Sequence, residues 1–151
     1  LLGSQKTNNS TFFESNNYKI DLKQTKSDLQ ITLPFHLLLN LNYTFKQKNN
    51  LLGIQKLYDH EMEMELQYRS PQKSTWMAKL KYLYLKSDQN LTGNIGYDML
   101  EGMALGKNAV WSLVYQFQIS DYLLLDFQYY GRASQFNKTI HTGNMQIKVI
   151  F

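Results

Sequence analysis

Apolar and polar residues alternate without a break from Leu29 to Phe45. Every odd position of this stretch is apolar and most even positions are polar, with Leu38 as the one large apolar exception. A period of two places successive side chains on opposite faces of an extended strand. Because strands of soluble proteins usually run about 3–10 residues, a single strand of this length needs a tall apolar environment. The hydrocarbon layer of a membrane, which a tilted strand crosses in about 9–11 residues, supplies one.

Composition is compatible with this interpretation and excludes other classes. There is no run of eighteen apolar residues, so a transmembrane helix is not expected, whereas alternating strands hide an apolar band in the mean hydropathy of −0.44. The absence of cysteine excludes disulfides and thiolate metal sites. The net charge of +4 comes from scattered lysines without a basic run or a stacking motif, so no nucleic-acid partner is predicted.

Alternation returns in further segments that turn signals separate, which predicts an antiparallel up-and-down sheet. We therefore expect an all-β fold, part of a transmembrane β-barrel of which this chain supplies about seven to eight strands. Residues 1–28 are expected to form an extracellular loop or hairpin that turns at Gln24–Ser27, and residues 29–151 the transmembrane strands. The predicted crossings are 29–46, 52–68, 75–86, 90–97, 109–119, 123–131 and 143–151.

Charges support one register for the hairpin of 52–68 and 75–86. If Tyr68 pairs with Trp76, then Glu65 faces Lys79, and Glu63 faces Lys81. Opposite charges that face each other across a ladder stabilise it by about 0.2–1 kcal/mol each, and the same register also matches the apolar faces. The row of Asp59, Glu61, Glu63 and Glu65 has two interpretations that both remain open: a row that selects cations in a pore, or a hydrated wall partly neutralised by lysines. The side chains predicted to face a wet lumen are Asp59, Glu61, Glu63, Glu65, Lys79 and Lys81.

Aromatic residues gather toward the ends of the predicted strands, which is typical of the two girdles at membrane–water interfaces. Short connections at 47–51, 87–90 and 120–122 are assigned to the periplasmic rim and the longer ones to the outer rim. The girdle toward the long loops is predicted to hold Tyr68, Trp76, Tyr97, Trp111 and Tyr129, and the girdle toward the short turns Tyr43, Phe45, Tyr58, Tyr82, Tyr84 and Phe117.

Four stretches near the C-terminus, Tyr97–Gly102, Trp111–Leu113, Tyr130–Ser134 and Ile140–Gly143, resemble the C-terminal ends of large outer-membrane barrels of the Bacteroidota. The resemblance covers the last third of the chain and departs at Asn144, where a basic residue is expected. It implies a location in the bacterial outer membrane, lipid or lipopolysaccharide and the barrel-assembly machinery as partners, and no particular activity. The last strand is similar to the assembly signal of such barrels, through Met145, Ile147, Val149 and Phe151.

Seven crossings leave an unpaired edge, which lipid does not hydrate. We therefore expect the C-terminal part of a larger barrel, with the remainder missing, cleaved or on other subunits, serving as a transport or secretion channel or as a membrane anchor in an outer-membrane complex. Two alternatives remain open. A complete eight-stranded barrel would use residues 5–24 as a further strand, and a soluble lipocalin-like carrier would turn the apolar faces inward around a small ligand.

Catalytic and metal sites are not indicated. His36, His60 and His141 lack the spacing of metal ligands, and Ser112, His141 and Asp98 have no nucleophile motif around them. The sequence therefore predicts no enzyme, no metal and no cofactor.

Overall fold

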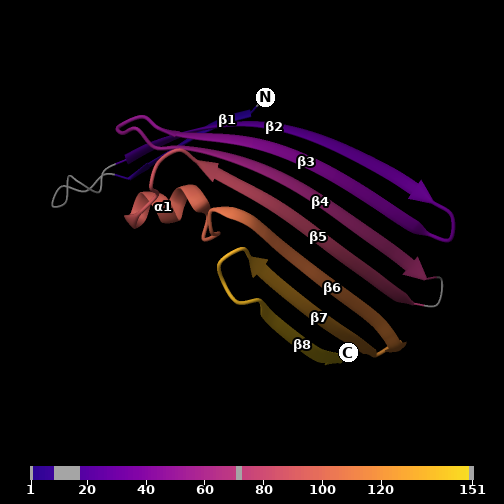
Figure 1. Cartoon of the computed structure of the whole chain (residues 1–151). Helices are drawn as coiled ribbons and strands as arrows, with labels where there is room; N and C mark the ends of the chain where they lie inside the picture. The colour runs from indigo at the N-terminus through magenta and orange to yellow at the C-terminus, as the bar shows by residue number, and fades with distance from the viewer. Residues whose placement is uncertain (1, 9–17, 71–72, 150–151) are drawn as a thin grey trace.

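The computed structural model describes residues 2–8, 18–70 and 73–149, the first of these ranges by its backbone alone. These residues form one curved antiparallel sheet of eight strands in chain order (Figure 1). The predicted all-β, up-and-down architecture is confirmed. Among the described residues the two outer strands do not pair with each other, so the sheet is not closed. The elements are β1 (Leu2–Asn8), β2 (Tyr18–Leu33), β3 (Leu37–Asn50), β4 (Lys56–Ser70), β5 (Ser74–Ser87), α1 (Gly93–Leu100), β6 (Gly106–Ser120), β7 (Leu123–Ser134) and β8 (Ile140–Val149).

The single strand predicted over 29–46 is wrong: it is the hairpin of β2 and β3. Leu33 faces Leu37 across a turn of residues 34–36, in which Phe35 and His36 adopt positive φ of 62° and 61°. Because the turn has an odd number of residues, odd-numbered side chains stay on the same face in both strands, and the alternation passes through it unbroken. Pro34, which has no N–H to donate to a ladder, is the sequence signal for the interruption.

The turn predicted at Gln24–Ser27 is also wrong. Strand β2 runs straight through these residues, with Gln24 facing Lys46 and Ser27 facing Tyr43. Strand β1 pairs only with the first part of β2, from Tyr18 to Gln24.

The strand predicted over 90–97 is instead a loop leading into the short helix α1. Leu91, Ile95 and Met99 recur every fourth residue, which is the spacing of one helical face, and the glycines of the segment weaken a strand. The helix ends at Glu101, which adopts the left-handed conformation with φ of 53°.

The two ends of the sheet carry different connections. The links 34–36, 71–73 and 121–122 share one end, the short-turn rim, while 51–55, 88–105 with α1, and 135–139 share the other, the long-loop rim. The predicted grouping of 120–122 with 47–51 and 87–90 is therefore wrong. The reason is that α1 replaces the crossing predicted at 90–97, so the chain reaches 120–122 at the opposite end of the sheet.

The strand ends form a staircase across the sheet. At the short-turn rim the last residue pairs of the three hairpins are Leu33–Leu37, Ser70–Ser74 and Ser120–Leu123. Leu37 faces Tyr68, two residues before Ser70, and Ser74 faces Phe117, three residues before Ser120. Each hairpin therefore extends further than the one before, by two residues and then by three. Five residues of about 3.3 Å over four strands about 4.8 Å apart correspond to a strand tilt of roughly 40°. Closed barrels require strands tilted by about 35–45°.

Candidate functional site

The ladders align the side chains in rows that run across the sheet. Leu29, Leu41, Met64, Leu80 and Trp111 form one row, and the next row holds Gln30, Asn40, Glu65, Lys79 and Ser112. Rows of the two kinds alternate through the middle of the sheet, so one face is apolar and the other polar. We call these the apolar face and the polar face. The part of β2–β7 between the row of Trp76 and the row of Tyr84 is the central band.

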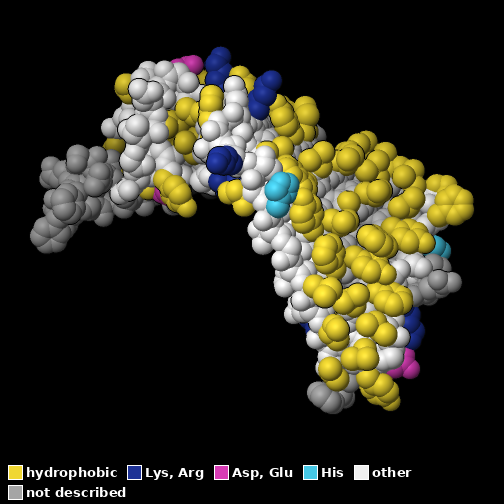
Figure 2. Space-filling view, turned by 60° about the horizontal axis from the view of Figure 1, so that its bottom comes forward, with side chains coloured by type: hydrophobic (Ala, Val, Ile, Leu, Met, Phe, Trp, Pro, Cys, Tyr) yellow, Lys and Arg dark blue, Asp and Glu magenta, His cyan; other side chains and the backbone are white. Residues whose placement is uncertain are grey.

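The apolar face of the central band is uncovered. Leu29, Met62 and Leu80 are 55, 59 and 45% exposed, and the hydrophobic side chains form a continuous field in Figure 2. A shallow groove of about 490 Å³ lies within this face, with Leu41 and Tyr82 among its walls. Monomeric soluble proteins rarely expose a continuous apolar surface, and such a surface usually marks a site where a protein, a membrane or a ligand binds.

The polar face has the opposite character, because its charges are partly or fully buried and paired. Asp59 and Glu61 are only 2 and 7% exposed. Lys79 lies 2.8 Å from Glu65, and Lys81 lies 2.8 Å from Glu61. The predicted register, with Glu65 opposite Lys79 and Glu63 opposite Lys81, is confirmed. All six predicted lumen charges lie on this face: Asp59, Glu61, Glu63, Glu65, Lys79 and Lys81.

Aromatic side chains border the central band on both sides, but the rims differ from the prediction. Tyr68, Trp76 and Phe117 lie toward the short-turn rim, whereas those toward the long-loop rim are Tyr43, Phe45, Tyr58, Tyr82 and Tyr84. Trp111 and Tyr129 lie inside the band, in the rows of Leu80 and Ala78, and belong to neither border. The predicted sides of Tyr68 and Trp76, and of the five β3–β5 aromatics of the second group, are thus wrong because the rims were misassigned. Tyr97 belongs to α1 and to neither group.

The height of the band follows from residue spacing. Trp76 and Tyr84 are eight residues apart on β5, roughly 26 Å along the strand. At a tilt of roughly 40° this is a height of roughly 20 Å, close to the apolar band of about 25 Å in outer-membrane barrels.

Polar atoms on the apolar face find partners within that face. Tyr43 and His60 are joined by a hydrogen bond of 2.8 Å, and Tyr129 and His141 by one of 2.7 Å. Neither histidine therefore leaves its Nδ1 unpaired in apolar surroundings, where a lost hydrogen bond is costly.

The amphipathic pattern inverts near the long-loop rim. On β5 the polar-face positions change from Lys79 and Lys81 to Leu83 and Leu85, while the apolar-face position after Tyr84 is Lys86. The same inversion occurs on β4, where Leu57 takes a polar-face position, and on β2 at Ile20. Sequence reasoning missed this reversal, although the change in phase of the alternation is its signal.

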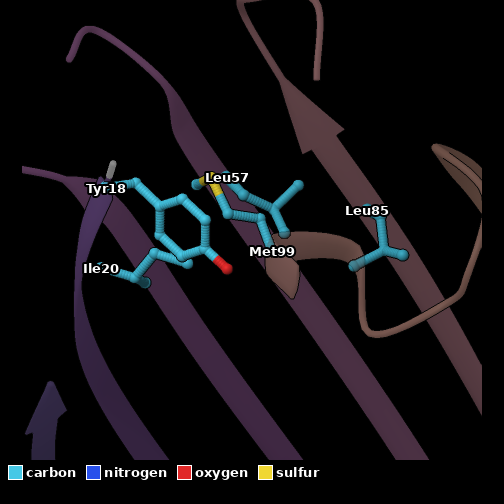
Figure 3. Packing of buried hydrophobic residues seen from close by; sticks show 5 residues of the cluster. All are labelled: Tyr18, Ile20, Leu57, Leu85 and Met99. Carbon is cyan, nitrogen blue, oxygen red and sulfur yellow. The ribbon is translucent and has the colours of Figure 1, made fainter. Parts of the chain in front are cut away.

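Helix α1 covers the inverted positions, as its place beside the ends of β5 and β6 shows (Figure 1). Leu57 and Met99 are completely buried and lie side by side (Figure 3). We call α1 and this cluster the α1 corner; the cluster holds Tyr18, Ile20, Leu57, Leu85 and Met99.

Polar contacts fasten α1 to the sheet. The ammonium of Lys48 donates to the carbonyl oxygen of Met99 and to the Glu101 carboxylate, both at 2.6 Å. Burial by itself raises the pKa of Glu101, but the hydrogen bond and charge of Lys48 outweigh it and hold that pKa below 4.5. Tyr18 donates to Asp98, and this hydrogen bond, with burial and the carboxylate charge, raises the pKa of Tyr18 to about 12.

The residues weighed for catalysis do not meet. Ser112 lies on the polar face, and His141 lies on the apolar face, where it contacts the ring of Trp111. Asp98 bonds Tyr18 instead. Among the described residues no three His, Cys, Asp or Glu side chains are grouped to hold a metal ion, and no described helix is both long and apolar enough to span a membrane.

The predicted assembly signal lies on β8, the outermost strand. Met145, Ile147 and Val149 are 67, 60 and 53% exposed and continue the apolar face. Phe151 lies outside the described residues.

Comparison with family models, with curated proteins and with solved structures gives no match for this chain.

Proposed function

We propose that this sheet is a section of the wall of a β-barrel in the outer membrane of a bacterium, with the apolar face toward lipid and the polar face toward a wet lumen. The role is not catalytic: the section contributes to a transport or secretion channel, or to the membrane anchor of an outer-membrane complex. The barrel-assembly machinery and further strands of the same barrel are its expected partners.

The observation that carries the proposal is the contrast between the two faces of the central band. Its apolar side chains are exposed, whereas its carboxylates and lysines are paired and partly buried. A soluble protein places most of its large apolar side chains inside and rarely exposes a continuous apolar face. Hydrocarbon against the apolar face and water against the polar face would give each face a matching environment.

Three features of the sheet support a barrel wall in particular. The staircase of strand ends corresponds to the tilt that barrels require, aromatic residues lie at both borders of a band of fitting height, and the links that join the described strands at one rim are two or three residues long. In outer-membrane barrels the short turns are periplasmic, so we assign the links 34–36, 71–73 and 121–122 to the periplasm and α1 to the outer side.

A soluble carrier is the second candidate. The groove of about 490 Å³ falls within the usual range of small-ligand sites, about 300–1,000 Å³, and a barrel of eight strands is the size that lipocalins use. In such a carrier the apolar face would be the interior and the polar face would meet water.

The two tryptophans separate these candidates, because both Trp76 and Trp111 lie on the apolar face. The protein, extracted with detergent and folded into lipid vesicles, is tested with nitroxide-labelled lipids that quench indole fluorescence at known depths. Trp111→Phe and Trp76→Phe variants assign the signal to one residue each. We expect both tryptophans to be quenched by lipid, Trp76 at the border of the band and Trp111 at a greater depth, because Trp111 shares the middle row with Leu80.

The carrier predicts a different result. Its protein remains in the aqueous fraction without detergent, its tryptophans are not quenched by the labelled lipids, and a small apolar ligand changes their emission. That combination would replace the membrane proposal.

A further inference from the structure

Two groups of lysines can be distinguished on strands β2 to β8. Those on the polar face each pair with a carboxylate: Lys26, Lys46, Lys48, Lys79, Lys81 and Lys148. A second group, Lys23, Lys56, Lys86 and Lys107, occupies apolar-face positions on β2, β4, β5 and β6. All four are exposed, and none of them forms an ion pair with another described residue. We call this second group the lysine belt.

The lysine belt lies immediately beyond the aromatic residues of the long-loop side. Lys86 faces Tyr58, Lys107 faces Tyr84, and Lys23 continues the row of Tyr58 through Gln47. Figure 2 shows lysine or arginine side chains between the hydrophobic field and the opposite end of the molecule.

The belt also follows the slant of the sheet. Lys56, Lys86 and Lys107 sit one on each of three adjacent strands, and each lies two residues nearer to the short-turn rim than the one before. The long-loop rim descends in the same direction, so the three ammonium groups keep a similar distance from the rim. Asp21 is the acidic side chain that shares this face of β2, and the belt stays positively charged with it included.

The apolar groove of about 490 Å³ lies on the short-turn side of the belt, beyond the row of Phe45, His60 and Tyr84; its lining includes Leu29, Leu41, Met64, Leu80 and Tyr82. A hollow of this kind accepts an alkyl chain, because its walls offer carbon atoms on several sides. Cations above and an apolar hollow below match the two parts of an anionic lipid: a phosphate headgroup and an acyl chain.

We propose that the lysine belt binds the phosphate headgroups of anionic membrane lipid, whose acyl chains lie on the apolar face and in the groove. This inference rests on the proposed function. Lysine suits this position because its alkyl stem lies along apolar surface while its ammonium reaches the headgroups. Pairing on the polar face leaves those lysines neutralised, whereas the belt presents unpaired positive charge at the level of the outer headgroups.

The experiment compares two triple variants of the full chain folded into vesicles. Lys56→Gln with Lys86→Gln and Lys107→Gln removes three charges from the belt. Lys26→Gln with Arg132→Gln and Lys138→Gln removes three charges elsewhere, from the polar face and from the loop 135–139. Urea unfolding midpoints are measured in phosphatidylcholine vesicles, with and without added phosphatidylglycerol, and separately with inorganic phosphate.

We expect phosphatidylglycerol to raise the midpoint of the parent protein and of the control variant. A lysine near an anionic surface contributes about fivefold in affinity, so the belt variant should bind about 10²-fold more weakly and lose the response. Inorganic phosphate should have little effect, because it has no chain for the groove.

Three results would overturn the inference: an undiminished response of the belt variant, an equal loss in the control variant, or equal stabilisation by inorganic phosphate. Failure of the parent protein to insert into either vesicle counts against the proposed function itself. Insertion into both vesicles with no response to phosphatidylglycerol counts against the lysine belt alone.

Discussion

The central band and the α1 corner are built from the same strands and bury the same side of them, but with side chains of opposite character. In the band, Met64 and Leu80 stand exposed on the apolar face while Glu65 and Lys79 pair behind them. In the corner, Leu57 and Leu85 occupy polar-face positions and are buried under α1. The corner packs as a soluble protein does, and the band does not. Under the proposed function, the environment on the apolar face changes from lipid to water between these two regions.

The largest effect is expected from a charge placed in the middle of the band. Met64→Lys puts a cation on the apolar face, where lipid exposure costs about 2–4 kcal/mol near the bilayer midplane. Asn40→Lys is the control, because it places the same charge on the polar face opposite Glu65. Urea titration of the protein folded in vesicles measures both, and near-equal stability of the two variants would contradict the assignment of the faces.

Truncation of methionine should distinguish the two regions next. Met99→Ala empties a completely buried site in the α1 corner and is expected to weaken the docking of α1 by about 2–3 kcal/mol. Met64→Ala removes a side chain that lipid replaces, so its cost in vesicles should stay below about 1 kcal/mol. Amide hydrogen exchange across 93–105 reads out the docking of α1. Equal costs at the two positions would show that the band is packed like the corner.

Removal of the hydrogen bonds between Lys48 and α1 should have a smaller effect, which depends on pH. Lys48→Met removes two hydrogen bonds and should loosen α1 by about 1–2 kcal/mol at neutral pH. Because the pKa of Glu101 is lowered in the folded protein, its contribution is present above about pH 4.5 and is lost as the pH falls through the folded-state pKa. The variant should therefore show a flatter acid profile of hydrogen exchange in α1, and an unchanged profile would argue against the tie.

Tyr18→Phe is expected to have the smallest effect, about 0.5–1.5 kcal/mol for one hydrogen bond. The pKa of Tyr18 is raised from 10.0 to about 12, so the bond to Asp98 contributes fully below pH 10 and is lost as the pH rises through about 12. Ultraviolet titration of tyrosine ionisation checks this: the phenylalanine variant should lack the latest-ionising group. If all tyrosines of the parent ionise near pH 10, the bond does not form.

Periodicity predicted most of the sheet because it depends on the local fit between strand and environment. The register of Glu63 and Glu65 with Lys81 and Lys79 followed from charge and apolar matching together. The hairpin at Pro34 was hidden because a three-residue turn preserves the parity of Leu33 and Leu37. Alternation alone therefore does not distinguish one long strand from two shorter strands with an odd turn.

The α1 corner was hidden for a different reason. Residues 90–97 hold apolar side chains at both strand and helix spacing, and the helix is further favoured by the packing of Met99 with the inverted positions on β2 and β4. That contact is long-range, so a local pattern does not report it. The inversion at Leu57 and Leu85 was nevertheless visible in the sequence, and it marks where β4 and β5 approach the long-loop rim.

Two neighbouring positions on β6 test the central claim most directly. Ser112 lies on the polar face and Leu113 on the apolar face, and the chain has no native cysteine to interfere. Ser112→Cys and Leu113→Cys variants, each labelled with the same small fluorophore before folding into vesicles, are exposed to an aqueous iodide quencher and to nitroxide lipid. The account predicts quenching by lipid only at position 113 and by iodide only at position 112. Quenching of both labels by iodide, with neither reached by the lipid, would contradict it.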